Sequence, residues 1–234
     1  MRLRVGLLCI VTQVATVKAN VEKAIFLGPP PATLSNDRPS LDDLGLPVLS
    51  PSDAILPAQL PVQFPTDTLP RGLASWYLLR ALDDGRRYEV RICWPATQPT
   101  DFWLDTYPIT HVFDTPELIS SLAEYSEQRQ GQRIEDGGGS KGALASVVLE
   151  SVLFLRVQAA ASYYSSNRTL MDYPPLVHVD IILDPFVLNV FPRSLGPVAV
   201  YITTVAIGAW FLSGYIYRWL LSVAAEPPRR QHTD

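Results

Sequence analysis

The clearest local pattern in the sequence is Arg86-Arg87-Tyr88-Glu89-Val90-Arg91-Ile92-Cys93-Trp94. Its apolar face would hold Tyr88, Val90, Ile92 and Trp94, and its opposite face Arg87, Glu89, Arg91 and Cys93. A period of two residues is typical of a half-buried strand. Asp83-Asp84-Gly85 separates this stretch from the apolar run Ala74–Leu82. Asp-Gly between two such runs predicts a β-hairpin.

Further short runs on either side have the composition of strands. We expect strands over Val21–Leu27, over Asp101–Thr106 (with Phe102 and Leu104, or Trp103, facing a core), over Leu144–Tyr164 as one long strand or a pair, and over Leu176–Leu183. One amphipathic helix is predicted over Thr115–Gln130, because Thr115-Pro116 is a good helix start and Leu118, Leu122 and Tyr125 follow at helical spacing. The fold class is therefore mainly β, with a β-sandwich-like domain.

A proline-rich segment interrupts this pattern between Pro29 and Pro70, where 10 of 42 residues are proline. Proline fixes φ and lacks a backbone donor, so we expect extended or irregular chain without a regular helix or central strand. The segment is either a surface loop or insertion, or an arm whose apolar residues cover another surface.

The C-terminal part contains a membrane-crossing signal. Residues 194–217 carry no formal charge and are rich in aliphatic and aromatic side chains. A bilayer core of roughly 30 Å needs about 20 such residues as a helix. We predict a single transmembrane helix over residues 195–221, followed by a tail of residues 222–234. Arg218, Arg229 and Arg230 on its C-terminal side place that tail in the cytosol by the positive-inside rule.

The N-terminal 19 residues resemble a cleavable signal peptide. Arg2 and Arg4 precede an apolar run, and Val17-Lys18-Ala19 places small residues where signal peptidase reads them. Residues 20–192 would then form a luminal domain of a type I, single-pass protein of the endoplasmic reticulum membrane. In that setting Asn167-Arg168-Thr169 is a glycosylation sequon, with Asn167 as the acceptor.

Charge and cysteine content limit the possible functions. Residues 20–192 contain 12 Lys and Arg against 21 Asp and Glu, a net charge of −9, which argues against nucleic-acid binding. Cys93 is the one cysteine left after signal cleavage, so no internal disulfide forms in the mature chain, and we expect a reduced, buried thiol.

Catalytic patterns are not recognisable. His111 and His178 have no second His or Cys at ligand spacing, so no metal site is predicted. We assign no catalytic and no cofactor-binding residue. Asp180 and Asp184 flank a strand near the membrane, where a carboxylate could contact a substrate or could simply be solvated or end the strand.

The apolar helix has one face of small residues. Ala199, Thr203, Ala206, Ala209 and Ser213 follow one another at intervals of four, three, three and four residues, which places them on one stripe. Small residues let a second transmembrane helix approach closely. This face predicts a partner within the membrane, and therefore a subunit.

Three segments carry a resemblance to a known family. Asn20-Val21-Glu22-Lys23-Ala24-Ile25-Phe26-Leu27-Gly28-Pro29, Tyr88-Glu89-Val90-Arg91-Ile92-Cys93-Trp94-Pro95-Ala96 and Asp180-Ile181-Ile182-Leu183-Asp184-Pro185-Phe186 resemble a fungal family, the co-activator (regulatory) subunit of GPI mannosyltransferase II. The resemblance implies a non-catalytic accessory subunit that binds the multi-spanning catalytic enzyme. That enzyme adds the second mannose to the GPI-anchor precursor, and the subunit would support its stability or activity.

Three other classes remain open from the residues. One is another accessory subunit of the endoplasmic reticulum, such as the stabiliser of the first GPI mannosyltransferase or a translocon-associated protein. A second is a type I cargo receptor, although its cytosolic tail would be only thirteen residues after Leu221. A third is a luminal enzyme, against which the missing catalytic pattern counts.

Overall fold

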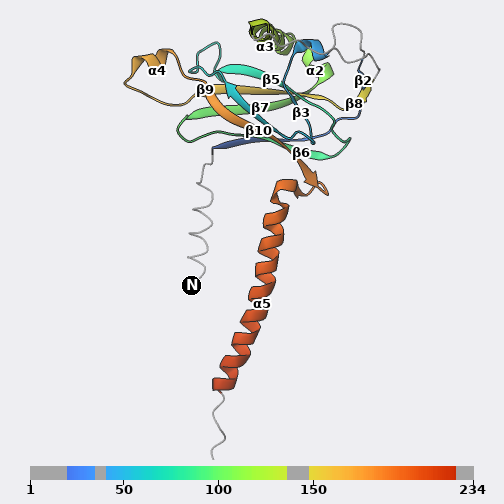
Figure 1. Ribbon diagram of the computed structural model, residues 1–234, viewed down its shortest axis with the longest axis vertical. Coiled ribbons are helices and arrows are strands. Elements are labelled where there is room, and N and C mark those ends of the chain that lie inside the picture. Colours follow the sequence, from blue (N-terminus) through green and yellow to red (C-terminus); the bar gives the residue numbers. More distant parts are fainter. Residues whose placement is uncertain (1–19, 35–40, 136–147, 225–234) are drawn as a thin grey trace, which may run out of the picture.

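The computed structural model describes residues 20–34, 41–135 and 148–224. The predicted signal peptide and the end of the predicted tail lie outside these ranges. Figure 1 shows two stacked sheets with helices over one of them, and a single long helix, α5 (Gly196–Ala224), that projects from the opposite side. The prediction of a mainly β domain followed by one long apolar helix is confirmed.

Sheet A contains the strands nearest to α5. Its five strands are β1 (Val21–Leu27), β4 (Ile55–Leu60), β6 (Arg87–Cys93), β10 (Val177–Val187) and β11 (Phe191–Pro192). The central strand is β10, which pairs with β6 on one side and with β4 and then β11 on the other; β1 pairs with the far edge of β6. All of these pairs are antiparallel.

Sheet B lies on the other side of the core. Its four strands run in the order β3 (Val48–Leu49), β5 (Leu73–Leu79), β9 (Leu153–Ala161) and β7 (Thr100–Pro108). Strand β3 is parallel to β5, and the other pairs are antiparallel. A separate two-stranded ribbon joins β2 (Ala32–Leu34) to β8 (Val148–Glu150).

The main core fills the space between the two sheets. Sheet A contributes the predicted apolar face of β6, in which Tyr88, Val90 and Ile92 have no exposed surface. Phe102 of β7 is 5% exposed and Leu104 packs beside the same core, so these two residues face inward. Sheet B adds alternate residues of β5 and β9, among them Tyr77, Leu79, Leu155 and Val157. The period-two pattern therefore identified the buried faces correctly.

Helices build a second core on the outer face of sheet B. The helices there are α2 (Ile109–Asp114) and α3 (Pro116–Glu135), which starts at the predicted proline. Leu118 and Leu122 of α3 pack with Trp76, Leu78 and Phe154 of the sheet. The remaining short elements are η1 (Leu41–Leu44), α4 (Arg168–Asp172) and η2 (Arg193–Leu195).

The predicted hairpin over residues 74–94 is wrong. Strands β5 and β6 lie in different sheets, so the Asp83-Asp84-Gly85 turn crosses the edge of the sandwich. The physical reason is that β5 is buried on both faces, by α3 on one side and by sheet A on the other, and its neighbours are β3 and β9. The turn pairs instead with Gly28, through Gly85 N to Gly28 O at 3.0 Å and Gly28 N to Arg86 O at 2.8 Å.

The proline-rich segment is part of the sandwich. It supplies β2, β3 and β4, and its residues Leu46, Leu49, Leu60 and Val62 are all no more than 6% exposed. Strand β4 tolerates Pro57 because it lies at the edge of sheet A, where one row of backbone donors is not needed. The expectation of extended chain therefore fits β4, but the segment is not a surface loop.

Candidate functional site

Helix α5 has no packing partner within the described part of the chain. None of its 29 residues is buried. It is also the one described helix that is long and apolar enough to cross a membrane. Bulky side chains that fold into no core include Trp210 at 78% and Phe211 at 71% exposed. An apolar helix of this kind needs lipid or another protein around it.

The predicted small-residue face lies along this exposed helix. Ala199, Thr203, Ala206, Ala209 and Ser213 are all exposed. The Thr203 hydroxyl donates to the Ala199 carbonyl at 2.8 Å, so this face presents no unsatisfied donor from that residue. The stripe is compatible with close helix packing, and its role as a packing face stays a prediction.

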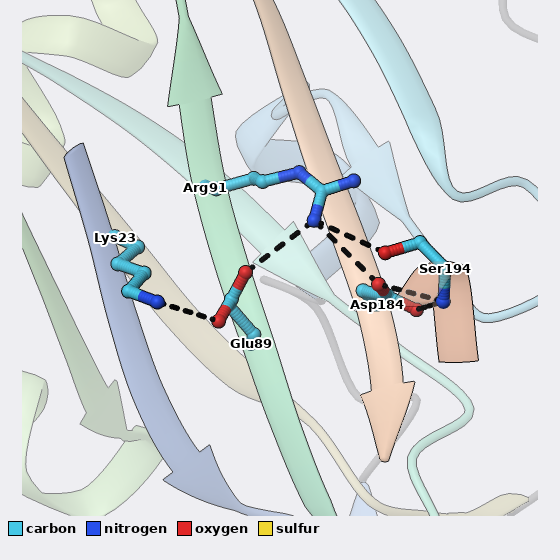
Figure 2. A network of polar contacts seen from close by, with 5 residues as sticks. All are labelled: Lys23, Glu89, Arg91, Asp184 and Ser194. Atoms are coloured by element: carbon cyan, nitrogen blue, oxygen red, sulfur yellow. Dashed lines mark hydrogen bonds and ion pairs between the residues drawn. The ribbon is translucent and has the colours of Figure 1, made fainter. Parts of the chain in front are cut away.

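A polar network joins α5 to sheet A. Figure 2 shows Lys23 of β1, Glu89 and Arg91 of β6, Asp184 of β10 and Ser194 of η2 in one chain of contacts. Lys23 Nζ lies 3.3 Å from Glu89 Oε2, and Arg91 Nη1 lies 3.4 Å from Glu89 Oε1 and 3.6 Å from Asp184 Oδ2. The backbone amide of Ser194 donates to both Asp184 oxygens at 3.2 and 3.3 Å. The turn before α5 is thereby attached to the central strand of sheet A.

Both carboxylates of this network are buried. The side chain of Glu89 is 5% exposed and that of Asp184 is 7% exposed. Carboxylates are rarely buried without a partner, and here two cations and a backbone donor supply the partners. The sequence suggested that Asp184 is either solvated or at the end of its strand. The structure shows that it is neither. Glu89 was missed, because the alternation of β6 placed it on a face that looked solvent-exposed.

Asp180 does not join this network. It lies exposed on β10, opposite Cys93 of β6 and Pro57 of β4. These residues line an open hollow of about 310 Å³ together with Trp94 and His178. Cys93 is a free thiol and is half-buried rather than buried.

The other candidate residues are held in structural roles. The His111 ring, on α2, stacks on Tyr107 with 5.5 Å between centroids, whereas His178 lies on β10 of sheet A. Among residues 20–34, 41–135 and 148–224, no three His, Cys, Asp or Glu side chains are grouped to hold a metal ion. The Asp83 carboxylate pairs with Arg86 at 2.7 Å, and the Asp83 amide donates to the Tyr88 hydroxyl at 2.9 Å. Burial of that hydroxyl raises the pKa of Tyr88.

The predicted glycosylation site is accessible. Asn167 is exposed and caps α4, where its Oδ1 accepts from the Thr169 amide at 3.0 Å. Whether it carries a glycan stays a prediction. Figure 1 places α4 at the end of the domain away from α5.

Comparison with known proteins connects this architecture to one family. Residues 74–125 match the model of the GPI-Mannosyltransferase II co-activator family. They include β5, the turn across the sandwich edge, β6, β7, α2 and the first half of α3. The matched segment therefore contributes strands to both sheets and includes Glu89 and Arg91 of the polar network.

A curated protein gives the same result. The GPI mannosyltransferase 2 subunit of Schizosaccharomyces pombe is 25% identical over 117 residues, which are 50% of this chain and 41% of the relative. The chain thus matches about two fifths of that relative's length. No solved structure matches the chain. The resemblance predicted from the sequence is confirmed: the chain is similar to co-activator subunits of GPI mannosyltransferase II.

Proposed function

We propose that this chain is a non-catalytic accessory subunit of the endoplasmic reticulum GPI mannosyltransferase that adds the second mannose to the GPI-anchor precursor. The observation that carries the proposal is the co-activator match over residues 74–125, which contribute strands to both sheets of the sandwich. A subunit role also explains why the apolar helix α5 packs against no core in the described part of the chain.

The polar network supports a structural role for the chain's buried charges. Each of its carboxylates lies within 4 Å of a lysine or an arginine, and Arg91 Nη1 contacts both, so the two facing negative charges are held by cations. The network holds the turn before α5 against sheet A. Such a connection suits a subunit that transmits or stabilises a geometry.

The topology follows from the same sequence features. The predicted signal peptide and the arginines after α5 support a luminal sandwich, one membrane crossing and a cytosolic side after α5. The catalytic subunit would be a multi-spanning protein, and the small-residue face of α5 would pack against one of its helices.

Depletion of the chain tests the function. Cells in which the protein is placed under a repressible promoter are labelled with radioactive inositol, and their GPI precursors are separated by mannose content. We expect the precursor with a single mannose to accumulate, and the wild-type chain to reverse the block. A normal set of mannosylated precursors would contradict the proposal and favour another accessory or cargo-receptor role.

A second measurement separates activation from stabilisation. The catalytic subunit is quantified in the depleted cells, and its activity is assayed after purification with and without this chain. Loss of the catalytic subunit with full activity of the remainder identifies stabilisation. A normal amount of inactive enzyme identifies activation.

A further inference from the structure

The turn between β10 and β11 has an unusual backbone and an unusual side chain. Val190 N donates to Val187 O at 3.0 Å, which closes a two-residue turn over Leu188 and Asn189. Both central residues have positive φ, 51° and 57°. Turns of this shape favour Asn and Gly, and a leucine in the left-handed region is strained. A strained residue of this kind is a reason to look for a function.

The side chains at this turn point into solvent. Leu188 is 88% exposed and Val190 is 71% exposed, so neither contributes to a core. Folding alone therefore gives no reason for a leucine at this position, where an asparagine or a glycine would cost less. Two apolar side chains at the tip of one turn form a small projecting apolar surface.

The turn is also held rigidly. Asn189 Oδ1 accepts from the Arg87 amide at 2.8 Å, and Asn189 Nδ2 donates to the Gly85 carbonyl at 3.1 Å. These bonds tie the turn to the loop that crosses the sandwich edge. Leu188 is thus presented at a fixed place on the domain.

That place lies next to the start of α5. Five residues, Phe191–Leu195, separate Val190 from the helix, so the two are no more than about 20 Å apart even in a fully extended chain. β11, η2 and the Asp184–Ser194 contact shorten the path further. Figure 1 shows the end of β10 beside the head of α5. The headgroup layer on each side of a bilayer is about 5–7 Å thick.

Two arginines flank the turn without an acidic partner. Within the described ranges, neither Arg193 nor Arg87 forms an ion pair; the Arg87 guanidinium lies 5.8 Å over the Phe186 ring. Arg193, Leu188 and Asn189 line an open hollow of about 530 Å³, which Asp84 also borders. Guanidinium groups bind phosphate oxygens in a bidentate manner. In an acidic domain, these unpaired cations are suited to lipid phosphates.

We propose that the β10–β11 turn is a second membrane contact: Leu188 and Val190 enter the headgroup layer of the bilayer, and Arg193 and Arg87 bind lipid phosphates beside them. This inference rests on the proposed membrane crossing by α5. The polar network fixes the domain to α5, but a single helix can still tilt in the bilayer and rotate about its own axis, and the domain moves with it. A rigid contact a few residues away fixes the orientation of sheet A relative to the membrane.

Depth-dependent quenching tests the contact. In the full chain with Cys9 and Cys93 changed to serine, a single cysteine at 188, 170 or 207 is labelled with NBD. Each labelled protein is then reconstituted alone into phosphatidylcholine and phosphatidylserine vesicles containing doxyl lipids. We expect NBD at 188 to be quenched by shallow doxyl groups about threefold more than NBD at 170, because Leu170 lies on α4 away from α5. Position 207 is the control for the crossing, in the middle of α5.

The outcomes are distinct. Quenching at 207 by deep doxyl groups with none at 188 overturns the turn contact and leaves the crossing intact. Absence of quenching at 207 would contradict both the membrane crossing and the turn contact. The subunit function is tested separately by the mannose-labelling experiment. Quenching at 188 in lipid vesicles that disappears in native microsomes shows that a protein covers the turn, and this also overturns the proposal.

A variant separates membrane contact from folding. Leu188→Asn places a preferred residue in the left-handed turn and removes the apolar side chain. We expect its thermal midpoint to be equal to or higher than that of the wild type, with shallow quenching of NBD at position 190 reduced about threefold. Unchanged quenching at 190 would show that Leu188 does not drive the contact.

Discussion

The carboxylate of Asp184 accepts hydrogen bonds from the backbone amide of Ser194, at 3.2 Å to Oδ2 and 3.3 Å to Oδ1. Asp184 belongs to the central strand of sheet A, and Ser194 belongs to the turn from which α5 starts. Arg91 contacts both, through its ion pair with Asp184 and a hydrogen bond of 3.3 Å to the Ser194 hydroxyl. The direction of α5 relative to the sandwich therefore depends on a few polar contacts.

Asp184→Ala should destabilise the domain by about 1–3 kcal/mol, because it removes the acceptor of a backbone donor and one partner of a partly buried arginine. Urea unfolding in detergent, followed by tryptophan fluorescence, measures the effect. Asp180→Ala is the matched control on the same strand and should change stability by less than about 0.5 kcal/mol, because Asp180 is exposed. Equal effects of the two substitutions would contradict a role for the network.

Gly72→Ala should destabilise the fold more than Gly85→Ala. Both glycines have positive φ, 70° and 67°. A Cβ at Gly72 would overlap the Ala159 carbonyl of the neighbouring strand, whereas a Cβ at Gly85 meets nothing within 4 Å. Gly85→Ala therefore costs the left-handed strain of about 1–2 kcal/mol, and Gly72→Ala adds an overpacking cost of about 1–3 kcal/mol. The difference in free energy of unfolding between the two variants isolates the steric part.

Alkaline pH should weaken the sandwich through Tyr77. Burial, followed by the nearby Tyr125, raises the pKa of Tyr77 well above its ordinary value of 10.0. The folded state thus keeps a proton that the unfolded state releases, so this contribution is complete below pH 10 and is lost as the pH rises further. Stability should fall by up to about 1.4 kcal/mol per pH unit from this group. The free energy of unfolding of Tyr77→Phe should fall less steeply above pH 10 than that of the wild type. Between pH 7 and 9 the two proteins should show the same dependence of stability on pH.

Replacing Ala206 and Ala209 together with leucine should weaken association with the catalytic subunit, because bulky side chains prevent close helix approach. Co-purification in mild detergent, quantified against the wild type, measures the loss. Gly208→Leu adds bulk to the opposite face of α5, where a Cβ meets nothing within 4 Å, and should leave co-purification unchanged. Equal losses for both variants would show that the small-residue face is not the contact.

Asn167→Asp and Thr169→Ala should both abolish the mobility shift caused by endoglycosidase, since each destroys the sequon. Neither should lower stability, because aspartate caps a helix as well as asparagine does and the Thr169 amide remains in place. Asn167→Gln should lose both the glycan and the cap, at a cost of about 1 kcal/mol. A wild-type band that does not shift would mean that the site is unused.

Local patterns predicted the buried faces well, and pairing between distant segments is where they failed. The alternation in Tyr88, Val90 and Ile92 is a property of one strand, so it could be recognised directly. The partners of β5 depend on residues about 80 positions away, and a short turn motif suggested the wrong neighbour. The unbroken apolar run Trp76–Leu79 was the available signal, because a strand buried on both faces does not alternate.

The polar network could not be predicted from the sequence, for a similar reason. Glu89 and Asp184 are 95 positions apart and are brought together by the β6–β10 register. A charged residue on the outer face of a strand normally lies in solvent. Burial here results from the turn before α5 and from Lys23 of an edge strand, neither of which is adjacent to Glu89 in the sequence.

The position of β10 in sheet A has a consequence for folding kinetics. Strands β1, β4 and β6 all precede residue 94 and are synthesised early. Strands β4 and β6 are joined only through β10, which ends at Val187 and is synthesised much later. Contacts between segments so far apart in the sequence slow folding. Until β10 is made, a growing chain exposes the pairing edges of β4 and β6 and the apolar face between the sheets, and such partly folded states aggregate readily. The domain should therefore be most dependent on chaperones during the synthesis of residues 94–187, and premature termination in that range should yield a chain that is degraded rather than one that is partly functional.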